Sequence, residues 1–232
     1  MNNKRLCFTA FVSGELYQNY IPIFLYSIFR SYPNSHSIIY CQDAIPDNVQ
    51  EQLNILNKYS SFDIVEDYYS DIKVSGQRLK ALRWVNNDLR LREYKYVYNA
   101  DIDIFYINET PELLEQHIYH SNLLKIPLSN VFRPISQIKN RNLTTFLRRI
   151  YFNGFFHAIK SLKESKVYTL KASGLHFVET QGYYNKIEPY MEKYFNYIID
   201  EKVSFLHHKD GFHNESLLAD ILSEAGFKDK IP

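Results

Sequence analysis

Asp101 and Asp103 are the residues of this sequence whose type and spacing most clearly suggest chemistry. They lie two apart near the end of an apolar run at 96–106, which we predict to be a strand, and strand periodicity would point both side chains to one face. Two adjacent carboxylates repel each other and are costly to bury, so packing alone does not explain them. A divalent cation resolves this conflict, because carboxylate oxygens suit Mg²⁺ or Mn²⁺. The alternative is that one aspartate caps the following turn and the other is solvated.

Strands that alternate with helices must position these aspartates. Apolar runs predict strands at 6–12, 37–41, 62–65 and 96–106, and helical spacing predicts helices at 20–32, 47–59 and 77–91. This alternation indicates βαβ units and therefore an α/β fold with a mainly parallel central sheet flanked by helices. In open parallel sheets, ligands bind beyond the carboxyl ends of the strands, which is where the aspartates are expected.

The second half of the sequence is less regular. It predicts helices that open at 110 and cover 144–163, 183–200 and 216–225, with one strand candidate at 174–179. No repeat and no Pro/Gly-rich linker separates the halves. We therefore predict a single domain over 1–232, with a regular half at 1–107 and a less regular half at 108–232.

Composition limits the classes of protein that this chain can belong to. With 45% hydrophobic and 23% charged residues it is expected to fold, and its net charge of +1 argues against a general nucleic-acid binder. Two cysteines, Cys7 and Cys41, are too few for a disulfide framework and are predicted to be buried thiols. The apolar run at 6–12 is short and Gly14-Glu15 after it lacks a clear small-residue cleavage pattern, so a first strand is favoured over a signal peptide. No run reaches the roughly 20 residues of a membrane span. We therefore expect a cytoplasmic protein.

Positive charge is concentrated in one segment, 133–171, where nine Lys and Arg residues face a single acid, Glu164. Apolar residues at helical spacing and several aromatic residues accompany them. A basic amphipathic helix of this kind would suit peripheral contact with an anionic membrane at its inner face, or a lipid diphosphate. An ordinary core-facing helix with a solvated basic face also explains the pattern and is slightly favoured. Nucleic acid is a third reading, but no recognisable binding motif supports it.

Several stretches together resemble the GT-A-fold glycosyltransferases, particularly glycosyltransferase-8-like enzymes and small bacterial capsule or lipopolysaccharide transferases. The matching stretches are YKYVYNADIDIFYI (94–107), TAFVSGELYQNYIPIFLYSI (9–28), KALRWVNND (80–88), IPLSNVFRP (126–134), SGLHFVETQGYY (173–184) and HNESLLADIL (213–222). The stretch with the two aspartates and the GLHFV stretch are the most specific. The resemblance implies a GT-A, Rossmann-like α/β fold, with a nucleotide-sugar-binding half at 1–107 and an acceptor-side half at 108–232.

The resemblance also implies roles for individual residues. Donor binding maps onto Thr9, Ala10, Tyr17, Arg83, Asp101 and Asn130; catalysis maps onto His176, Asn214 and Glu215; and the metal ligands map onto Asp101 and Asp103, with His213 as a further candidate. The metal would be Mn²⁺ or Mg²⁺. Two departures from the family stand out. Asn214 replaces an aspartate, and the C-terminal H-x-x-G-x-x-K-P-W segment that completes the metal site is missing, so that His207, His208, His213 or water would take its place.

The implied function is a metal-dependent glycosyltransferase. It would move a sugar from a nucleotide-sugar donor, a UDP-sugar first, to a glycan or lipid-linked glycan acceptor in surface polysaccharide biosynthesis. One alternative is a catalytically silent binding protein on the same scaffold. Another is a sugar nucleotidyltransferase, but such enzymes carry a glycine-rich phosphate loop after the first strand, where this chain has only Gly14. No nucleic-acid partner is expected.

Overall fold

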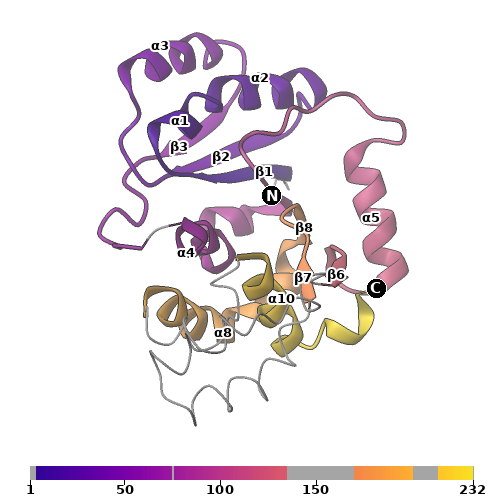
Figure 1. Cartoon of the computed structure of the whole chain (residues 1–232). Coiled ribbons are helices and arrows are strands. Elements are labelled where there is room, and N and C mark those ends of the chain that lie inside the picture. Colours follow the sequence, from indigo (N-terminus) through magenta and orange to yellow (C-terminus); the bar gives the residue numbers. More distant parts are fainter. Residues whose placement is uncertain (1–3, 75, 135–169, 201–213, 232) are drawn as a thin grey trace. The chain divides into compact units, whose positions relative to one another are not determined.

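The computed structural model describes residues 4–74, 76–134, 170–200 and 214–231 (Figure 1). The chain divides into two compact units that interleave along the sequence, and each is described by itself. The first unit comprises Met1–Lys73, Asn87–Asn130 and Gly174–Lys186, and the second comprises Val74–Asn86, Val131–Ser173 and Ile187–Pro232. The single domain over 1–232, with halves at 1–107 and 108–232, stays a prediction.

The first unit is built on one sheet. Its strands, in spatial order, are β3 (Phe62–Val65), β2 (His36–Cys41), β1 (Lys4–Val12), β4 (Tyr94–Ala100), β8 (His176–Glu179) and β5 (Leu128–Ser129). The pairings from β3 to β4 are all parallel, and β8 runs antiparallel to both of its neighbours. The predicted α/β fold with a mainly parallel sheet is therefore confirmed.

The order of the strands reverses beside β1. This strand pairs in parallel with β2 on one side, with Val12 opposite Cys41, and with β4 on the other, with Ala10 opposite Ala100. The chain therefore leaves the carboxyl ends of β1 and β4 in different directions. In open α/β sheets such a switch point is where ligands bind.

Helices cover the sheet of the first unit. α2 (Ile21–Ser31) and α3 (Asp47–Leu56) pack against each other on one face of β1 to β3 (Figure 1). α2 buries Ile21, Phe24, Leu25 and Ile28, the apolar stripe expected of a helix on a core. α5 (Leu113–Leu124) packs against β5.

Aromatic side chains fill the core beneath α2. The ring of Tyr106 lies 4.9 Å from that of Phe8, 5.8 Å from Phe24 and 6.1 Å from Tyr32, all near edge-to-face. Such pairs stabilise a core beyond the area that they bury. Burial, helped by nearby Glu109, raises the pKa of Tyr98 in the same cluster to about 12, so this tyrosine stays neutral.

The second unit contains short elements around one helix. They are α4 (Gly76–Ala81), the 3₁₀ helix η1 (Leu82–Val85), β6 (Phe132–Pro134), β7 (Leu170–Ala172), the part of α8 (Thr180–Ile199) from Ile187 onward, α10 (Asn214–Glu224) and η4 (Lys228–Lys230). α10 packs against β7, α4 and η4, and β6 pairs antiparallel with β7.

The helix predicted at 77–91 is confirmed only as far as Val85, where α4 and then η1 cover the chain, and its continuation as one helix is wrong. It is interrupted after Val85, and a second 3₁₀ helix, η2 (Leu89–Glu93), begins after Asp88. The side chain of Asp88 accepts a 2.9 Å hydrogen bond from the backbone N–H of Arg90, which caps η2. Asn and Asp side chains compete in this way with helical hydrogen bonds, so the run Asn86-Asn87-Asp88 ends the helix.

Other predicted boundaries move by a few residues. The strand predicted at 96–106 starts at Tyr94 and ends at Ala100, and the helix expected from 110 begins at Leu113. Three short strands, β5, β6 and β7, are not predicted from the sequence. The helix predicted at 144–163 lies outside the described residues.

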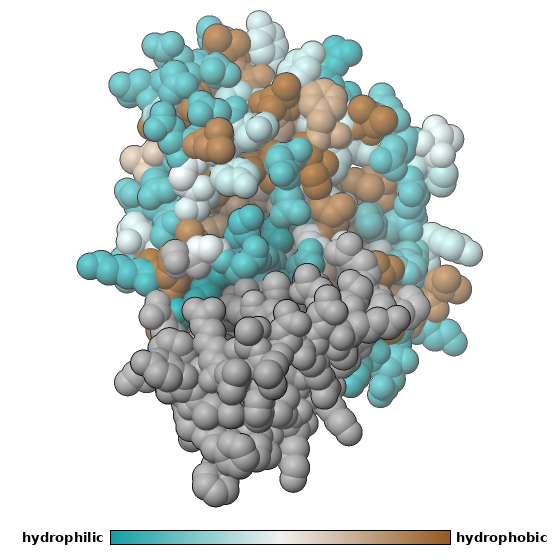
Figure 2. Space-filling model, in the orientation of Figure 1, coloured by the Kyte–Doolittle hydropathy of each residue, from teal (hydrophilic) through white to brown (hydrophobic). Residues whose placement is uncertain are grey.

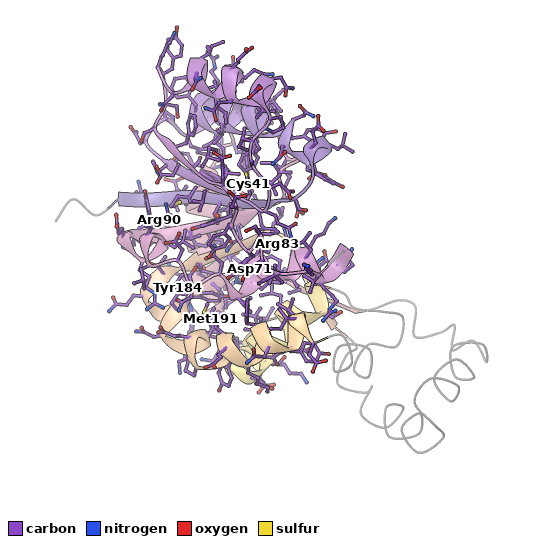
Figure 3. All side chains as sticks on the ribbon, turned by 90° about the vertical axis from the view of Figure 1, so that its left-hand side faces the viewer. Cys41, Asp71, Arg83, Arg90, Tyr184 and Met191 are labelled. Carbon is purple, nitrogen blue, oxygen red and sulfur yellow. The ribbon has the colours of Figure 1, made fainter. Side chains whose placement is uncertain are left out.

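The expectation of buried thiols is confirmed, since Cys7 and Cys41 are both free and buried. Burial, with the nearby carboxylates of Glu66 and Asp43, raises the pKa of Cys41 (labelled in Figure 3) to about 12. Hydrophilic and hydrophobic residues intermix on the described surface shown in Figure 2. Among the described residues, no helix combines the length and the apolar character needed to cross a membrane.

Candidate functional site

The two aspartates lie in a turn that follows β4, called here the acidic turn (residues 101–103). The backbone N–H of Ile104 donates a 3.3 Å hydrogen bond to the carbonyl oxygen of Asp101. Asp101 is half-buried, Ile102 is buried and Asp103 is exposed. A turn, rather than the two-residue period of a strand, therefore orients the carboxylates.

The chain that follows the acidic turn is fixed to α2. The backbone N–H of Tyr106 donates to the hydroxyl of Ser27 at 3.1 Å, and the hydroxyl of Ser31 donates to the carbonyl of Tyr106 at 3.2 Å. The phenol of Tyr32 donates to the carbonyl of Ile107 at 3.3 Å. The acidic turn is therefore held from both sides, by the β4 ladder before it and by α2 after it.

The loop after β1 is joined to the loop after β2. The hydroxyl of Ser13 donates to the side-chain oxygen of Gln42 at 2.8 Å, and the N–H of Gly14 donates to a carboxylate oxygen of Asp43 at 3.1 Å. Gly14 has φ 83°, a left-handed conformation that favours glycine, and it turns the chain into α1 (Glu15–Gln18). Polar groups thus gather at the carboxyl ends of β1 and β2.

The donor residues predicted near β1 differ in exposure. Thr9 and Ala10 are buried in the strand, whereas Tyr17, in α1, is 39% exposed. The ring of Tyr17 lies 6.4 Å from that of Tyr20. Of these three side chains, only the Tyr17 ring is accessible to a planar ligand at this edge. Thr9 and Ala10 are buried within β1.

Asn130 and His176 form a buried polar pair at the same edge of the sheet. The side-chain nitrogen of Asn130 lies 2.8 Å from Nδ1 of His176, and β4 places Asn99 opposite His176. An amide nitrogen only donates, so Nδ1 accepts and the ring proton resides on Nε2. The ring of Tyr183 packs against His176 at 5.1 Å. The pairing of β8 with β4 and β5 thus brings these two predicted residues together.

A cluster of two histidines and a serine, which was not predicted from the sequence, involves α5 and β5. Nδ1 of His117 and Nδ1 of His120 are each 2.8 Å from the hydroxyl of Ser129 in β5. The ring of His117 stacks on that of Phe177 at 5.0 Å. Burial, with His120 nearby, lowers the pKa of His117 to about 4. The sequence signal is the spacing of the two histidines, one helical turn apart and thus on one face.

In the second unit, Arg83 and Asn214 are in contact. A terminal guanidinium nitrogen of Arg83, labelled in Figure 3, donates to the side-chain oxygen of Asn214 at 3.4 Å. The guanidinium also lies over the Trp84 ring, 4.1 Å from its centroid. The side-chain nitrogen of Asn214 donates to the side-chain oxygen of Gln77 at 2.5 Å. Gln77 was not predicted as a site residue. Glu215 follows in the first turn of α10 and is half-buried.

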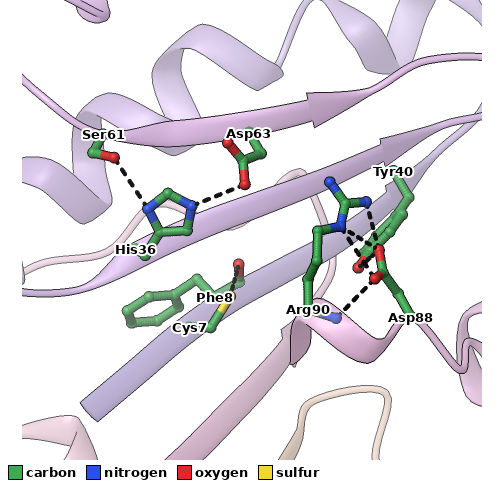
Figure 4. A network of polar contacts seen from close by, with 8 residues as sticks. All are labelled: Cys7, Phe8, His36, Tyr40, Ser61, Asp63, Asp88 and Arg90. Atoms are coloured by element: carbon green, nitrogen blue, oxygen red, sulfur yellow. Dashed lines mark hydrogen bonds and ion pairs between the residues drawn. The ribbon is translucent and has the colours of Figure 1, made fainter. Parts of the chain in front are cut away.

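A further polar network anchors the chain that leads into β4. Asp88 accepts hydrogen bonds from the phenol of Tyr40 at 3.0 Å and from the guanidinium Nε of Arg90 at 2.9 Å (Figure 4). Burial by itself raises the pKa of Asp88, but the hydrogen bonds from Arg90 and Tyr40 bring it below its ordinary value. This network fixes the start of the strand that carries the acidic turn.

The predicted site residues thus fall into two sets. Tyr17, the acidic turn and the Asn130–His176 pair share the carboxyl edge of the sheet in the first unit, while Arg83, Asn214 and Glu215 belong to the second. His207, His208 and His213 lie outside the described residues. Across the part of the chain that the structure describes, His, Cys, Asp and Glu side chains nowhere gather in a group of three that could hold a metal ion.

Comparisons with known proteins agree with this architecture. No protein-family model and no curated protein matches the chain. Among solved structures, the mannosyltransferase Ktr4p from S. cerevisiae matches with a TM-score of 0.59 at 13% identity, over 99% of this chain and 68% of that one. Its complex with GDP matches with a TM-score of 0.55 at 12% identity and the same coverage. Core-mannan synthase A (CmsA/Ktr4) from Aspergillus fumigatus, in a Mn/GDP form, matches at 0.48 and 8% identity, over 95% of this chain and 70% of that one.

The two Ktr4p structures, which match with TM-scores above 0.5, are glycosyltransferases of the GT-A type. At such low sequence identity the likeness concerns the fold. The chain therefore has the GT-A glycosyltransferase fold.

Proposed function

We propose that this protein is a metal-dependent glycosyltransferase that moves a sugar from a nucleotide-sugar donor to a glycan or lipid-linked glycan. One observation carries the proposal: two carboxylates stand in a fixed turn at the β1/β4 switch point. Ligands of open α/β sheets bind at that point. Carboxylates held at that point suit a phosphate-containing ligand that binds together with a divalent cation.

The acidic turn fits a hard divalent cation. Asp101 and Asp103 offer oxygen ligands beyond the end of the strand, with Asp103 exposed. Mg²⁺ typically takes one or two carboxylates and completes its shell with water and substrate phosphates, and Mn²⁺ accepts the same ligands. When bound, the cation would act as a Lewis acid for the departing diphosphate. His213 remains the candidate for a third protein ligand.

The remaining donor contacts follow from side-chain chemistry. The exposed ring of Tyr17 would stack on the nucleobase, and Thr9 and Ala10 would form the floor beneath it. The guanidinium of Arg83 has the fork geometry that binds phosphate oxygens in pairs, and the Trp84 ring holds its plane. Fixed donors of this kind stabilise the charge that develops on the leaving group.

Three residues are proposed for the sugar. Asn130, oriented by its contact with His176, would hydrogen-bond to sugar hydroxyl groups. Glu215, in the first turn of α10, would orient the sugar or stabilise positive charge that develops on its ring, and Asn214 would assist beside it. His176 acts by holding Asn130, because its own ring is buried.

The finer assignments rest on the sequence, the first three on its resemblance to the family and the location on its apolar pattern and its charge. They are a glycosyltransferase-8-like enzyme, a hexosyl group from a UDP-sugar, a role in surface polysaccharide biosynthesis, and a cytoplasmic location with contact to the inner membrane face through 133–171. The solved complex of Ktr4p contains GDP, so GDP-sugars belong in the same test. For the membrane contact, binding to vesicles should require anionic lipid and weaken with salt.

The donor-binding experiment combines thermal unfolding with slow donor hydrolysis. UDP-, GDP- and TDP-sugars are each tested with Mn²⁺, with Mg²⁺ and with a chelator. We expect one nucleotide class to raise the melting temperature only with metal, and to be hydrolysed. Asp101→Asn and Asp103→Asn should each weaken this binding about tenfold or more, because a neutral amide is a poorer ligand.

Glu115→Gln, an exposed acid in the first turn of α5, is the matched control and should leave binding unchanged. If no nucleotide sugar shifts the melting temperature and Asp103→Asn has no effect, the proposal is wrong. Metal-dependent binding with neither hydrolysis nor transfer would favour the silent binding protein instead.

A further inference from the structure

Gln77, in α4, makes a contact that gives it a role in the site proposed above. Its side-chain oxygen accepts a 2.5 Å hydrogen bond from the side-chain nitrogen of Asn214. The oxygen of the same Asn214 amide accepts from Arg83 at 3.4 Å. Three residues from α4, η1 and the start of α10 thus form one chain of hydrogen bonds within the second unit.

The chemistry of the guanidinium fixes the direction of this chain. Arginine carries five N–H donors and no acceptor, so the Asn214 oxygen must face Arg83. The Asn214 NH₂ group then points the other way and needs an acceptor. Gln77 supplies that acceptor through its oxygen. A reversed Asn214 amide would set its NH₂ against the guanidinium, a repulsive contact, and would pair with Gln77 only after the Gln77 amide had turned as well.

The Arg83 contact depends on this orientation because it is long. A distance of 3.4 Å is at the upper end of the range for a hydrogen bond, so a small rotation of the Asn214 amide would break it. Asn214 is buried, with 6% of its surface exposed, and its amide is therefore oriented by protein partners. On the other side, the Trp84 ring holds the guanidinium plane at 4.1 Å.

Asparagine at position 214 makes the Gln77 acceptor necessary. An aspartate, which the resemblance leads one to expect, would present two accepting oxygens and could face Arg83 in either orientation. Asparagine has an NH₂ group, which needs a hydrogen-bond acceptor. Gln77 and Asn214 therefore work as a matched pair in this chain.

We propose that Gln77 is a positioning residue: it holds the Asn214 amide so that the Arg83 guanidinium stays oriented for the anionic part of the donor. The anionic ligand of Arg83 rests on the proposed function, whereas the orientation of Asn214 by Gln77 does not. Gln77 itself is exposed and acts through Asn214.

The test compares two substitutions of similar size. Gln77→Met removes the acceptor, and Gln77→Glu keeps an accepting oxygen. We expect Gln77→Met to lower kcat about tenfold with the nucleotide sugar found above, while Gln77→Glu stays within about threefold of the wild type. In an Asn214→Ala background Gln77→Met should add no further loss, because the two residues act as one unit. Gln50→Met, on the exposed surface of α3, is the matched control.

Equal losses for Gln77→Met and Gln77→Glu, or additive losses with Asn214→Ala, would overturn the proposal. A crystal structure of Gln77→Met provides a readout that needs no donor. The Asn214 oxygen should have left Arg83, and an unchanged contact would also refute the role of Gln77. If the wild type acts on no nucleotide sugar but the contact is lost in Gln77→Met, the proposed function fails and the role of Gln77 in orienting Asn214 stands.

Discussion

The backbone N–H of Tyr106 donates a 3.1 Å hydrogen bond to the hydroxyl of Ser27, a residue 79 positions away in α2. The same hydroxyl donates to the carbonyl of Phe24 at 2.7 Å, so its proton and one lone pair are both used. This one side chain ties the segment that follows the acidic turn to the helix that covers β1. The position of Asp101 and Asp103 therefore depends on a serine in the core.

Ser27→Ala should destabilise the protein because it removes the hydrogen bond between the Ser27 hydroxyl and the Tyr106 N–H. The Tyr106 N–H would be left in the core without its acceptor, which costs about 1–3 kcal/mol of the free energy of unfolding. Urea unfolding followed by circular dichroism measures this loss. Ser31→Ala is the control, because the Ser31 hydroxyl only donates to the Tyr106 carbonyl from a less buried position. Equal stability of Ser27→Ala and the wild type would show that the hydrogen bond from Tyr106 to Ser27 does not stabilise the fold.

The elements that position the site were largely predictable from sequence, for an identifiable reason. The strands at β1, β2 and β3 are short apolar runs between polar turns, and α2 carries its apolar residues at helical spacing. Local pattern and tertiary structure agree in these places. The alternation of strands and helices then fixes a parallel sheet, and with it the edge at which the aspartates lie.

The failures occur where tertiary contacts decide the structure. Apolar residues continue from β4 through Ile104 to Tyr106, yet the strand stops at Ala100, because a turn forms and Tyr106 bonds to α2 instead of to a neighbouring strand. β5 has two residues, too few for any periodic pattern. Gln77 has no motif, and its role appears only because α10 brings Asn214 to α4.

Asp88 should make the protein sensitive to acid. The hydrogen bonds from Arg90 and Tyr40 keep the pKa of Asp88 below its ordinary value in the folded protein. Between the folded and unfolded pKa values the unfolded chain binds more protons, so this carboxylate stabilises the fold above pH 4 and the stabilisation is lost as the pH falls further. In Asp88→Asn that part of the acid sensitivity should disappear.

The measurement is the difference in unfolding free energy between wild type and Asp88→Asn at pH 6 and pH 3. The wild type should have the larger unfolding free energy at pH 6, and its advantage over Asp88→Asn should be smaller at pH 3. Asparagine keeps an oxygen for the Arg90 N–H that caps η2, whereas Asp88→Ala also loses this cap, at a further cost of about 1 kcal/mol. A difference that is the same at both pH values would contradict the explanation.

His117 should add a second pH dependence, over a different range. Burial is the larger cause, and His120 the smaller one, of a folded pKa near 4, against 6.5 in an unfolded chain. Between these values the unfolded state binds the proton, so stability should fall as the pH is lowered from about 6.5 to 4 and then level off. His117→Gln cannot titrate but can still hydrogen-bond to Ser129. Relative to this variant, the wild type should lose stability over that range, and parallel profiles would refute the prediction.

Asp220, in α10, should behave in the opposite way. Burial, followed by the nearby carboxylate of Glu224, raises its pKa to about 8, although Lys193 and Lys228 partly oppose the shift. Lys193 is already engaged with both carboxylate oxygens of Glu224, at 2.5 and 2.8 Å. Folded Asp220 therefore keeps a proton that the unfolded chain releases above its ordinary pKa of 3.8.

Unfolding thus releases this proton, and the stability of the wild type should decline as the pH rises from about 4 to 8. Asp220→Asn keeps the shape of the protonated acid and never becomes charged, so its advantage over the wild type should grow across that range. Melting temperatures of both proteins at pH 5 and pH 8.5 test this, with Asp229→Asn, an exposed acid of η4, as the control. If the advantage of Asp220→Asn were the same at both pH values, Asp220 would not be the group that loses its proton on unfolding.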